Sequence, residues 1–363
     1  MKPDITALTA QATALLKDLI ALPSFSGQED KTAQRISVYL EEKNIPVRRK
    51  DNNVWAVNRY FDKEKPTLLL NSHHDTVKPN TKWTFDPFTP TEQEGKLIGL
   101  GSNDAGAPLV SLLAAFVYFY DAERLPFNII MAATAEEETS GKKGLRSVLD
   151  EFGPIDLAVV GEPTGMQLAV AEKGLMVLRC KAHGKSGHAA RDVGENAIYK
   201  AIQDINWFRN YRFARESSFL GPVKMTVTII NAGSQHNVIP DVCDFTVDIR
   251  MTDAYTNEQV LETIKKHIKC EIDSVSLSLK PSSIDPQHPL VEAARSLNMN
   301  TFGSPTLSDQ SLIDAPSVKI GPGMSERSHT ADEFVYPEEI RQGVEGYIKL
   351  LERFFTIIPH TVP

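Results

Sequence analysis

The pattern of hydrophobic and polar positions divides this chain into two kinds of region, which differ in how their predicted strands are patterned. In residues 1–174, short runs of consecutive apolar residues predict buried strands at 54–58, 67–71, 97–100, 127–133 and 157–160. Apolar residues at helical spacing predict helices at 4–22, 29–43, 105–120 and 142–149, with Ser26-x-x-Glu29 as a capping box before the second helix. Such alternation of buried strands and helices is typical of an α/β sheet with helices on both faces.

The second kind of region begins near residue 174. Strands that are apolar at every other position are predicted at 176–182, 223–229, 245–249 and 275–279. Two amphipathic helices fall between them, at 198–208 and 257–268, the second with Asn257 as its N-cap. This β-α-β-β-α-β order predicts a ferredoxin-like unit.

From about residue 285 the pattern is again that of residues 1–174, with a helix predicted at 290–297, a strand at 317–320 and a final helix at 337–355. We therefore expect one α/β domain formed by residues 1–174 and 285–363. A small α+β domain at 175–284 is inserted into it.

Composition excludes several classes of function. The formal net charge of −8 gives no electrostatic footprint for nucleic acid. The longest apolar stretch, 108–120, is too short to span a bilayer, and the N-terminus lacks the apolar run of a signal peptide. Three cysteines without a C-x-x-C pair favour a reducing compartment. We expect a cytoplasmic protein that binds neither nucleic acid nor membrane.

Acidic and imidazole residues follow several predicted strands. They are His73 and Asp75, Asp104, the run Glu136–Glu138, Glu162, and His329 in a later loop. Each has an ordinary explanation: Asp104 as a helix N-cap, the glutamates as a helix N-terminus, and the others as loop surface. Because functional groups gather where the strands of an α/β sheet end, the whole set predicts a shared site.

Imidazole and carboxylate ligands without thiolates favour a catalytic zinc site. If two ions bind, one carboxylate must bridge them, and Asp104 is the natural candidate. A further carboxylate that is not a ligand is needed as general base. The adjacent residues Glu137 and Glu138 are suited to divide the roles of base and ligand.

A series of short motifs resembles the co-catalytic zinc aminoacylase and deacetylase family, which includes acetylornithine deacetylases, succinyl-diaminopimelate desuccinylases and bacterial glutamate carboxypeptidases. The resemblance runs from about residue 15 to 350. In chain order the motifs are NSHHDTV, W-x-x-DPF, GLGSND, ATAEEET, VVGEPT, HGKSGHA, NVIPD, DIR and SHTADE. The resemblance implies a zinc-peptidase-like mixed sheet between helices, with the inserted ferredoxin-like domain as a lid and dimerisation domain.

The resemblance also implies a role for each matching residue. His73 and Glu162 would bind one zinc ion, Glu138 and His329 the other, and Asp104 both. Asp75 would orient His73, and Glu137 would be the general base. His188 would reach the active site of the other subunit of a homodimer and stabilise the oxyanion. The residues that would hold a substrate carboxylate are Lys173, Asn237 and Arg250, although an ion pair with Asp248 is the ordinary explanation of Arg250.

The implied activity is removal of an N-acyl group from an amino acid by two zinc ions, or by cobalt or manganese in their place. The favoured substrate is N2-acetyl-L-ornithine, within arginine biosynthesis. The alternatives are deacylation of N-acetylcitrulline or an N-succinyl amino acid, a di- or carboxypeptidase, and a non-catalytic binding protein.

Three positions depart from the family pattern. His74 fills the variable position of the His-x-Asp motif, Glu136 stands where aspartate is usual, and 105–107 reads Ala-Gly-Ala after Asp104. Register favours His73 over His74 as the ligand.

Overall fold

The computed structural model describes residues 2–191 and 193–358, so residues 359–363 of the predicted large domain lie outside it. The chain forms two compact units. The larger comprises 1–170, 283–302 and 308–363, and the smaller comprises 171–282 and 303–307. These bounds differ from the predicted 175–284 by a few residues, and the short segment 303–307 joins the smaller unit.

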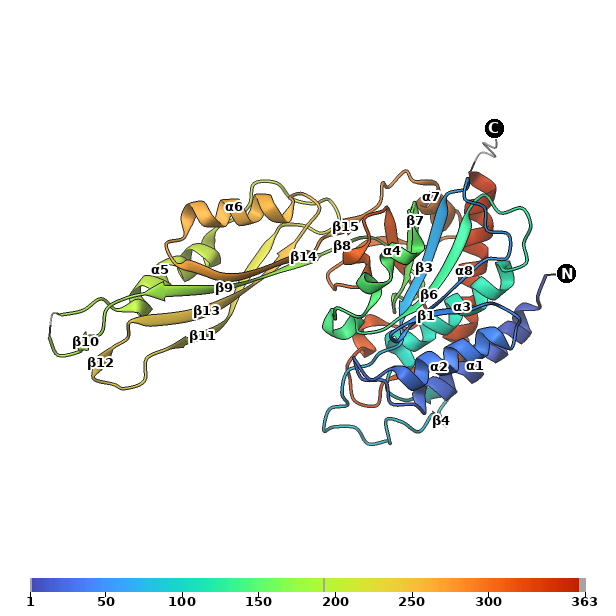
Figure 1. Ribbon diagram of the computed structural model, residues 1–363, viewed down its shortest axis with the longest axis horizontal. Coiled ribbons are helices and arrows are strands. Elements are labelled where there is room, and N and C mark those ends of the chain that lie inside the picture. The colour runs from blue at the N-terminus through green and yellow to red at the C-terminus, as the bar shows by residue number, and fades with distance from the viewer. Residues whose placement is uncertain (1, 192, 359–363) are drawn as a thin grey trace. The chain divides into compact units, whose positions relative to one another are not determined.

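The largest sheet has the strand order β1-β2-β6-β3-β7-β17-β8-β15, with β16 beside β8 (Figure 1). Its centre is parallel: β3 lies between β6 and β7, and β17 follows β7. The outer pairs β1–β2, β2–β6 and β17–β8 are antiparallel. The strands are β1 (Arg48–Lys50), β2 (Asn53–Val57), β3 (Thr67–His73), β6 (Asn128–Thr134), β7 (Leu157–Gly161), β8 (Leu168–Glu172), β15 (Ser282–Ser283), β16 (Thr301–Ser304) and β17 (Ser317–Ile320).

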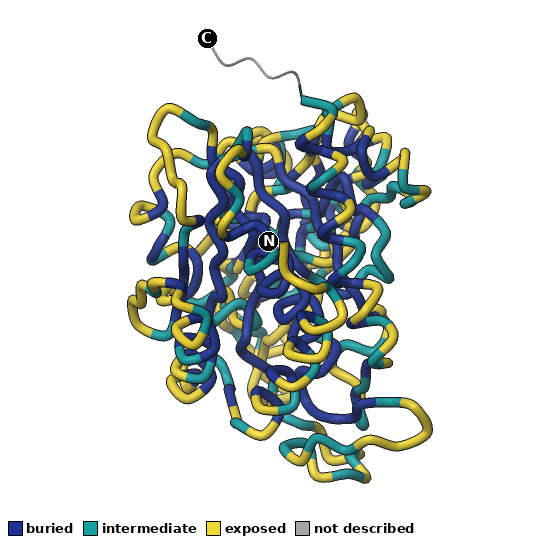
Figure 2. Tube along the Cα trace, turned by 90° about the vertical axis from the view of Figure 1, so that its right-hand side faces the viewer, coloured by how far each residue is buried: buried dark blue, intermediate teal, exposed yellow. Residues whose placement is uncertain are grey.

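Both faces of this sheet are covered. Helix α3 packs against β3, β6 and β7, and α1 and α8 pack against α3. On the other face, alternate residues such as Leu69 of β3 and Ile130 of β6 form a core with Leu145 and Phe152. The helices of this unit are α1 (Ile5–Ile20), α2 (Asp30–Glu41), α3 (Ala107–Phe119), α4 (Leu149–Phe152), α7 (Pro289–Ser296) and α8 (Pro337–Ile357). Figure 2 shows buried residues along the interior segments and exposed residues mainly on peripheral loops.

A separate small sheet has the order β18-β5-β4, formed by β4 (Thr91–Gln93), β5 (Lys96–Ile98) and β18 (Phe334–Val335). The prediction that 97–100 belongs to the main sheet is therefore wrong. These residues look like a buried strand because Leu97, Ile98 and Leu100 are buried, but β5 pairs with its neighbour β4 and the distant strand β18, not with the main sheet.

The smaller unit is a ferredoxin-like sheet with the order β11-β13-β9-β14, and all its pairs are antiparallel. Helices α5 (Ala197–Asn210) and α6 (Asn257–His267) cover one face through a shared hydrophobic core. The strands of this sheet are β9 (Gly174–His183), β11 (Lys224–Ala232), β13 (Val242–Met251) and β14 (Glu271–Leu279). A separate antiparallel pair is formed by β10 (Gly187–His188) and β12 (Val238–Ile239). The predicted fold class is confirmed in both units.

Two predicted helix caps are wrong. Thr256, not Asn257, caps α6, in a capping box with Gln259. Asn257 is buried and donates its amide to the carbonyl of Leu277 instead. Ser26 and Glu29 form no capping box, because both side chains are bound to other partners in the tertiary structure.

No helix within residues 2–191 and 193–358 has the length and apolar character needed to cross a membrane.

Candidate metal centre

The predicted ligands follow the carboxyl ends of neighbouring parallel strands. His73 ends β3 and is paired with Thr134 at the end of β6, after which the chain continues into Glu136–Glu138. Glu162 follows Gly161, the last residue of β7. Parallel pairing aligns these ends at one edge of the sheet, as the sequence predicts. Asp104 does not follow a strand of this sheet; it lies in the loop between β5 and α3.

The carboxylate of Asp104 lies between two imidazoles. Its Oδ1 is 3.3 Å from Nε2 of His73, and its Oδ2 is 3.6 Å from Nε2 of His329. Each imidazole has a second carboxylate beside it. Glu162 Oε1 lies 3.7 Å from Nε2 of His73, and Glu138 Oε2 lies 2.9 Å from Nε2 of His329. Asp104 is thus shared by two groups of three ligands.

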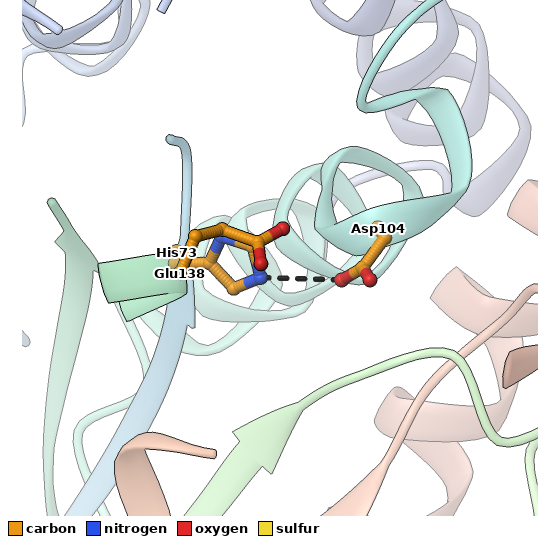
Figure 3. Close-up of side chains that lie close together, drawn as sticks. All are labelled: His73, Asp104 and Glu138. Atoms are coloured by element: carbon orange, nitrogen blue, oxygen red, sulfur yellow. Dashed lines mark hydrogen bonds and ion pairs between the residues drawn. The ribbon is translucent and has the colours of Figure 1, made fainter. Parts of the chain in front are cut away.

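The two groups lie close together. One ligand atom each from His73, Asp104 and Glu138 fall within 4.8 Å of one another. In Figure 3 the carboxyl group of Glu138 lies beside the ring of His73, and Asp104 faces the same ring. Groups of one imidazole and two carboxylates suit a catalytic divalent ion, because three protein ligands leave a position open.

Electrostatics supports a cation at this place. Burial of the His73 ring opposes its protonation, but Asp104 and Asp75 outweigh burial and raise its pKa well above the usual value. The Glu138 carboxylate, which accepts a hydrogen bond from the His329 ring, raises the pKa of His329 to about 9. The carboxylates therefore favour positive charge at both rings, and a divalent cation supplies that charge when the rings are neutral ligands. The described residues thus fit a pair of metal ions.

Asp75 holds more than its neighbouring histidine. The Nδ1 atom of His73 lies 3.0 Å from the backbone oxygen of Asp75 and 3.4 Å from its carboxylate. The carboxylate accepts the Ser26 hydroxyl at 2.7 Å and the backbone N–H groups of Glu137 and Glu138 at 3.0 and 3.2 Å. Two oxygens of Asp75 thus face the His73 ring, and the carboxylate also holds the turn that carries Glu137, so the role of Asp75 in orienting His73 stays a prediction.

The three consecutive glutamates point to different partners. Glu136 has a left-handed φ of 55° and its carboxylate accepts the backbone N–H of Lys143 at 3.0 Å. Glu138 contacts His329. Burial, together with the charges of Glu162, Asp309 and Glu138, raises the pKa of Glu137 well above the usual value. A carboxyl group with raised affinity for protons in a buried acidic site suits a general base.

His74 is turned away from the ligand set. Its Nδ1 lies 2.9 Å from the Thr32 hydroxyl, and its Nε2 lies 2.9 Å from the backbone oxygen of Asn52. Burial lowers its pKa to about 4, so the ring is neutral. Both ring nitrogens are occupied by structural partners, which agrees with His73 as the ligand.

The remaining predicted site residues belong to the smaller unit. Arg250 forms an ion pair with Asp248, at 2.9 Å between Nε and Oδ1, which is its ordinary explanation. Burial and the charges of Lys224 and Arg250 lower the pKa of Lys173. His188 is exposed, and the backbone N–H of Ala189 donates to the carbonyl of Asn237 at 3.0 Å.

The smaller unit separates these residues into two groups. Lys173 directly precedes β9, and Arg250 pairs with Leu175 near the start of that strand. His188 and Asn237 lie beyond its other end. Ten residues of strand at 3.3 Å per residue separate the groups by about 30 Å. Within this unit, Asn237 is therefore not brought to Arg250.

Sequence patterns missed three buried carboxylates around the ligands. Glu29 accepts the backbone N–H groups of Gly27 and Glu136 and the side-chain amide of Asn52. Asp309 accepts the Thr134 hydroxyl and the Asn71 amide. Glu333 accepts three N–H groups of the loop that carries Asp104. For Glu29 and Glu333, the available signal in the sequence was an acidic residue within the segments FSGQED and SHTADE.

Comparison with known proteins places this arrangement in a family. The model of peptidase family M20/M25/M40 matches residues 69–353. The chain belongs to this family. The predicted resemblance is confirmed, and so is the prediction of a hydrolase at the level of the M20/M25/M40 family.

Two curated relatives illustrate the range of the family. The chain is 24% identical to succinyl-diaminopimelate desuccinylase 2 of Ruegeria sp. (strain TM1040), over 94% of each protein. It is 27% identical to the acetylornithine deacetylase of Proteus mirabilis (strain HI4320), over 94% of this chain and 96% of the relative.

Solved structures share the fold. The aminopeptidase PepT of Bacillus cereus has a TM-score of 0.78 at 18% identity, covering 95% of this chain and 98% of that one. A dinuclear metal-binding peptidase of the M20 family from Bacillus subtilis has a TM-score of 0.73 at 17% identity, covering 97% and 100%.

Proposed function

We propose that this M20/M25/M40 protein is a two-metal amidohydrolase that removes an acyl group from the amino group of an amino acid, with N2-acetyl-L-ornithine as its substrate. The observation that carries the proposal is the position of Asp104, whose two carboxylate oxygens face His73 and His329. Zinc is the proposed metal, because the ligands are imidazoles and carboxylates.

In the proposed centre, His73 and Glu162 would hold one ion, His329 and Glu138 would hold the other, and Asp104 would be a ligand of both. When bound, such ions polarise the amide carbonyl and lower the pKa of water to about 7. The protein's own part is to fix the ligands and to handle protons. Asp75 and Glu29 fix the position of the ligand-bearing turn, because their carboxylates together accept the backbone N–H groups of Glu136, Glu137 and Glu138.

Glu137 handles the proton in this proposal. Its carboxylate removes a proton from the attacking water, and its carboxyl group then donates that proton to the amine nitrogen as the C–N bond breaks. The products are a free amino acid and a carboxylic acid. Because Glu137 lies beside the ligands without being needed as one, its base function is separable from metal binding.

The choice of acetyl follows the acetylornithine deacetylase of Proteus mirabilis, which matches this chain over 94% of its length. The desuccinylase relatives make N-succinyl amino acids the second candidate.

Metal analysis with a hydrolysis panel tests the proposal. The substrates are acetyl- and succinyl-ornithine, acetylcitrulline, succinyl-diaminopimelate and a dipeptide. We expect two zinc ions per chain and the highest kcat/KM for acetylornithine. Highest kcat/KM for a succinylated compound would replace the proposed substrate, and turnover of the dipeptide alone would overturn the deacylase proposal.

The proposal extends to His188 and to a homodimer in the cytoplasm. The three cysteines form no disulfide, which supports a reducing compartment. We propose that His188 stabilises the oxyanion in the partner's site, a role that its exposed position permits.

For His188→Ala we expect kcat to fall about 10²–10³-fold, the usual cost of losing one oxyanion donor, with metal content unchanged. Mixing this variant with Glu137→Gln is the decisive control. Mixed dimers regain activity if His188 acts in the partner's site. Unchanged turnover of His188→Ala would remove the oxyanion role.

A further inference from the structure

Glu333 lies beneath the loop that carries Asp104. Its side chain is buried, and its carboxylate accepts three backbone N–H groups of that loop. The donors are Gly101 at 3.1 Å, Asn103 at 2.9 Å and Asp104 at 2.8 Å. A single side chain therefore binds the backbone N–H groups of the shared ligand, of the residue before it and of Gly101, three residues before it.

The loop needs such an acceptor because its backbone is not helical. Asp104 has φ −116° and ψ 101°, so its N–H does not enter the regular hydrogen bonding of α3. Gly101 has a positive φ of 72°, and a Cβ there would lie 2.5 Å from Cγ2 of Thr76. A buried N–H group left without an acceptor destabilises the fold, so this loop depends on the Glu333 carboxylate.

The small sheet fixes Glu333 in register with this loop. Phe334 of β18 pairs with Ile98 of β5, and the N–H of Gly99 donates to the backbone oxygen of Glu333 at 3.0 Å. The backbone of Glu333 is therefore joined to the residue where the loop begins, and its side chain to the residue where the loop presents its ligand.

We propose that Glu333 is a positioning residue that sets the orientation of the Asp104 carboxylate, and through it the binding of both metal ions. The inference rests on the proposed two-metal centre. It has a specific consequence: since Asp104 belongs to both groups of ligands, its displacement weakens both ions together. A residue that supports only one of the groups would affect one ion.

The experiment compares Glu333→Gln with Asp332→Asn. Asp332 is a matched control because its half-buried side chain also accepts backbone N–H groups, those of Thr84 and Phe85, which lie outside the loop that carries Asp104. Metal-free protein is titrated with Co2+, and calorimetry and the visible spectrum of the bound cobalt report affinity and coordination. Thermal unfolding of the metal-free proteins measures stability separately.

We expect Glu333→Gln to weaken both ions about 10–100-fold, the range found when a partner of a metal ligand is lost, and to change the cobalt spectrum. Asp332→Asn should leave both affinities unchanged. Glu333→Asp separates position from charge, because it keeps the negative charge but shortens the side chain. It should also weaken both ions.

The outcomes are distinguishable. If the wild-type protein binds fewer than two ions, the proposed metal centre fails. If it binds two and Glu333→Gln keeps both affinities, even with a lower unfolding temperature, Glu333 has only a structural role and the inference is overturned. Wild-type affinities in Glu333→Asp would show that charge alone matters and would also overturn it.

Discussion

We expect that replacing Glu137 by glutamine will abolish nearly all turnover and leave the binding of the two proposed metal ions unchanged. The amide keeps the size of the side chain but neither accepts a proton from water nor returns one to the leaving amine. Loss of general acid–base catalysis costs about 10²–10⁴ in rate, and a group that acts in both directions belongs at the upper end of this range. The measurement is kcat by steady-state hydrolysis, with metal content determined on the same sample.

Glu136→Gln is the matched control, since it makes the same chemical change one residue earlier. The Glu136 carboxylate accepts the backbone N–H of Lys143, and a glutamine oxygen also accepts it. We expect near-wild-type turnover. Normal turnover in Glu137→Gln would remove the proposed mechanism, and loss of metal in that variant would make Glu137 a ligand rather than a base.

We expect that replacing His73 by alanine will remove one of the two proposed metal ions and weaken the binding of the other. His73 supplies the only imidazole of its proposed group, and its Nε2 lies beside both Asp104 and Glu162. Without it, the remaining carboxylates repel one another and Asp104 loses one of its two imidazole partners. We expect at most one ion per chain. The loss of affinity should exceed the about 10–100-fold cost of losing a mere partner of a ligand.

His74→Ala is the control at the adjacent position. Its ring nitrogens face Thr32 and the backbone of Asn52, so we expect two bound ions with lower stability. Leaving buried partners without hydrogen bonds costs about 1–3 kcal/mol, which denaturant unfolding measures. If His74→Ala lost metal and His73→Ala kept it, the assignment of the ligand would be reversed.

Local patterns were sufficient for much of the fold. The strands at 67–71 and 157–160 are runs of consecutive apolar residues, and both lie in the parallel centre of the sheet. Alternation at every second position in 245–249 marked β13, one face of which lies in the core of the smaller unit. These predictions succeed because burial on one or two faces imposes a period that is visible within a few residues.

Patterns failed where long-range hydrogen bonds override a local motif. Ser26 and Glu29 have the spacing of a capping box. In the structure, however, the Ser26 hydroxyl donates to Asp75, 49 residues away, and Glu29 accepts the N–H of Glu136, 107 residues away. The buried partners leave neither side chain free to cap α2.

The sequence by itself determined which residue types are available for the centre: two imidazoles and several carboxylates, placed by motif at the ends of predicted strands. Tertiary structure decided how they are held. It brought Asp104, in the loop that follows the small sheet, to the edge of the main sheet, and it placed Glu333 beneath the Asp104 loop across separations of 229–232 residues. Hydrogen bonds between a side chain and a distant backbone leave no period in the sequence, so only the folded chain shows them.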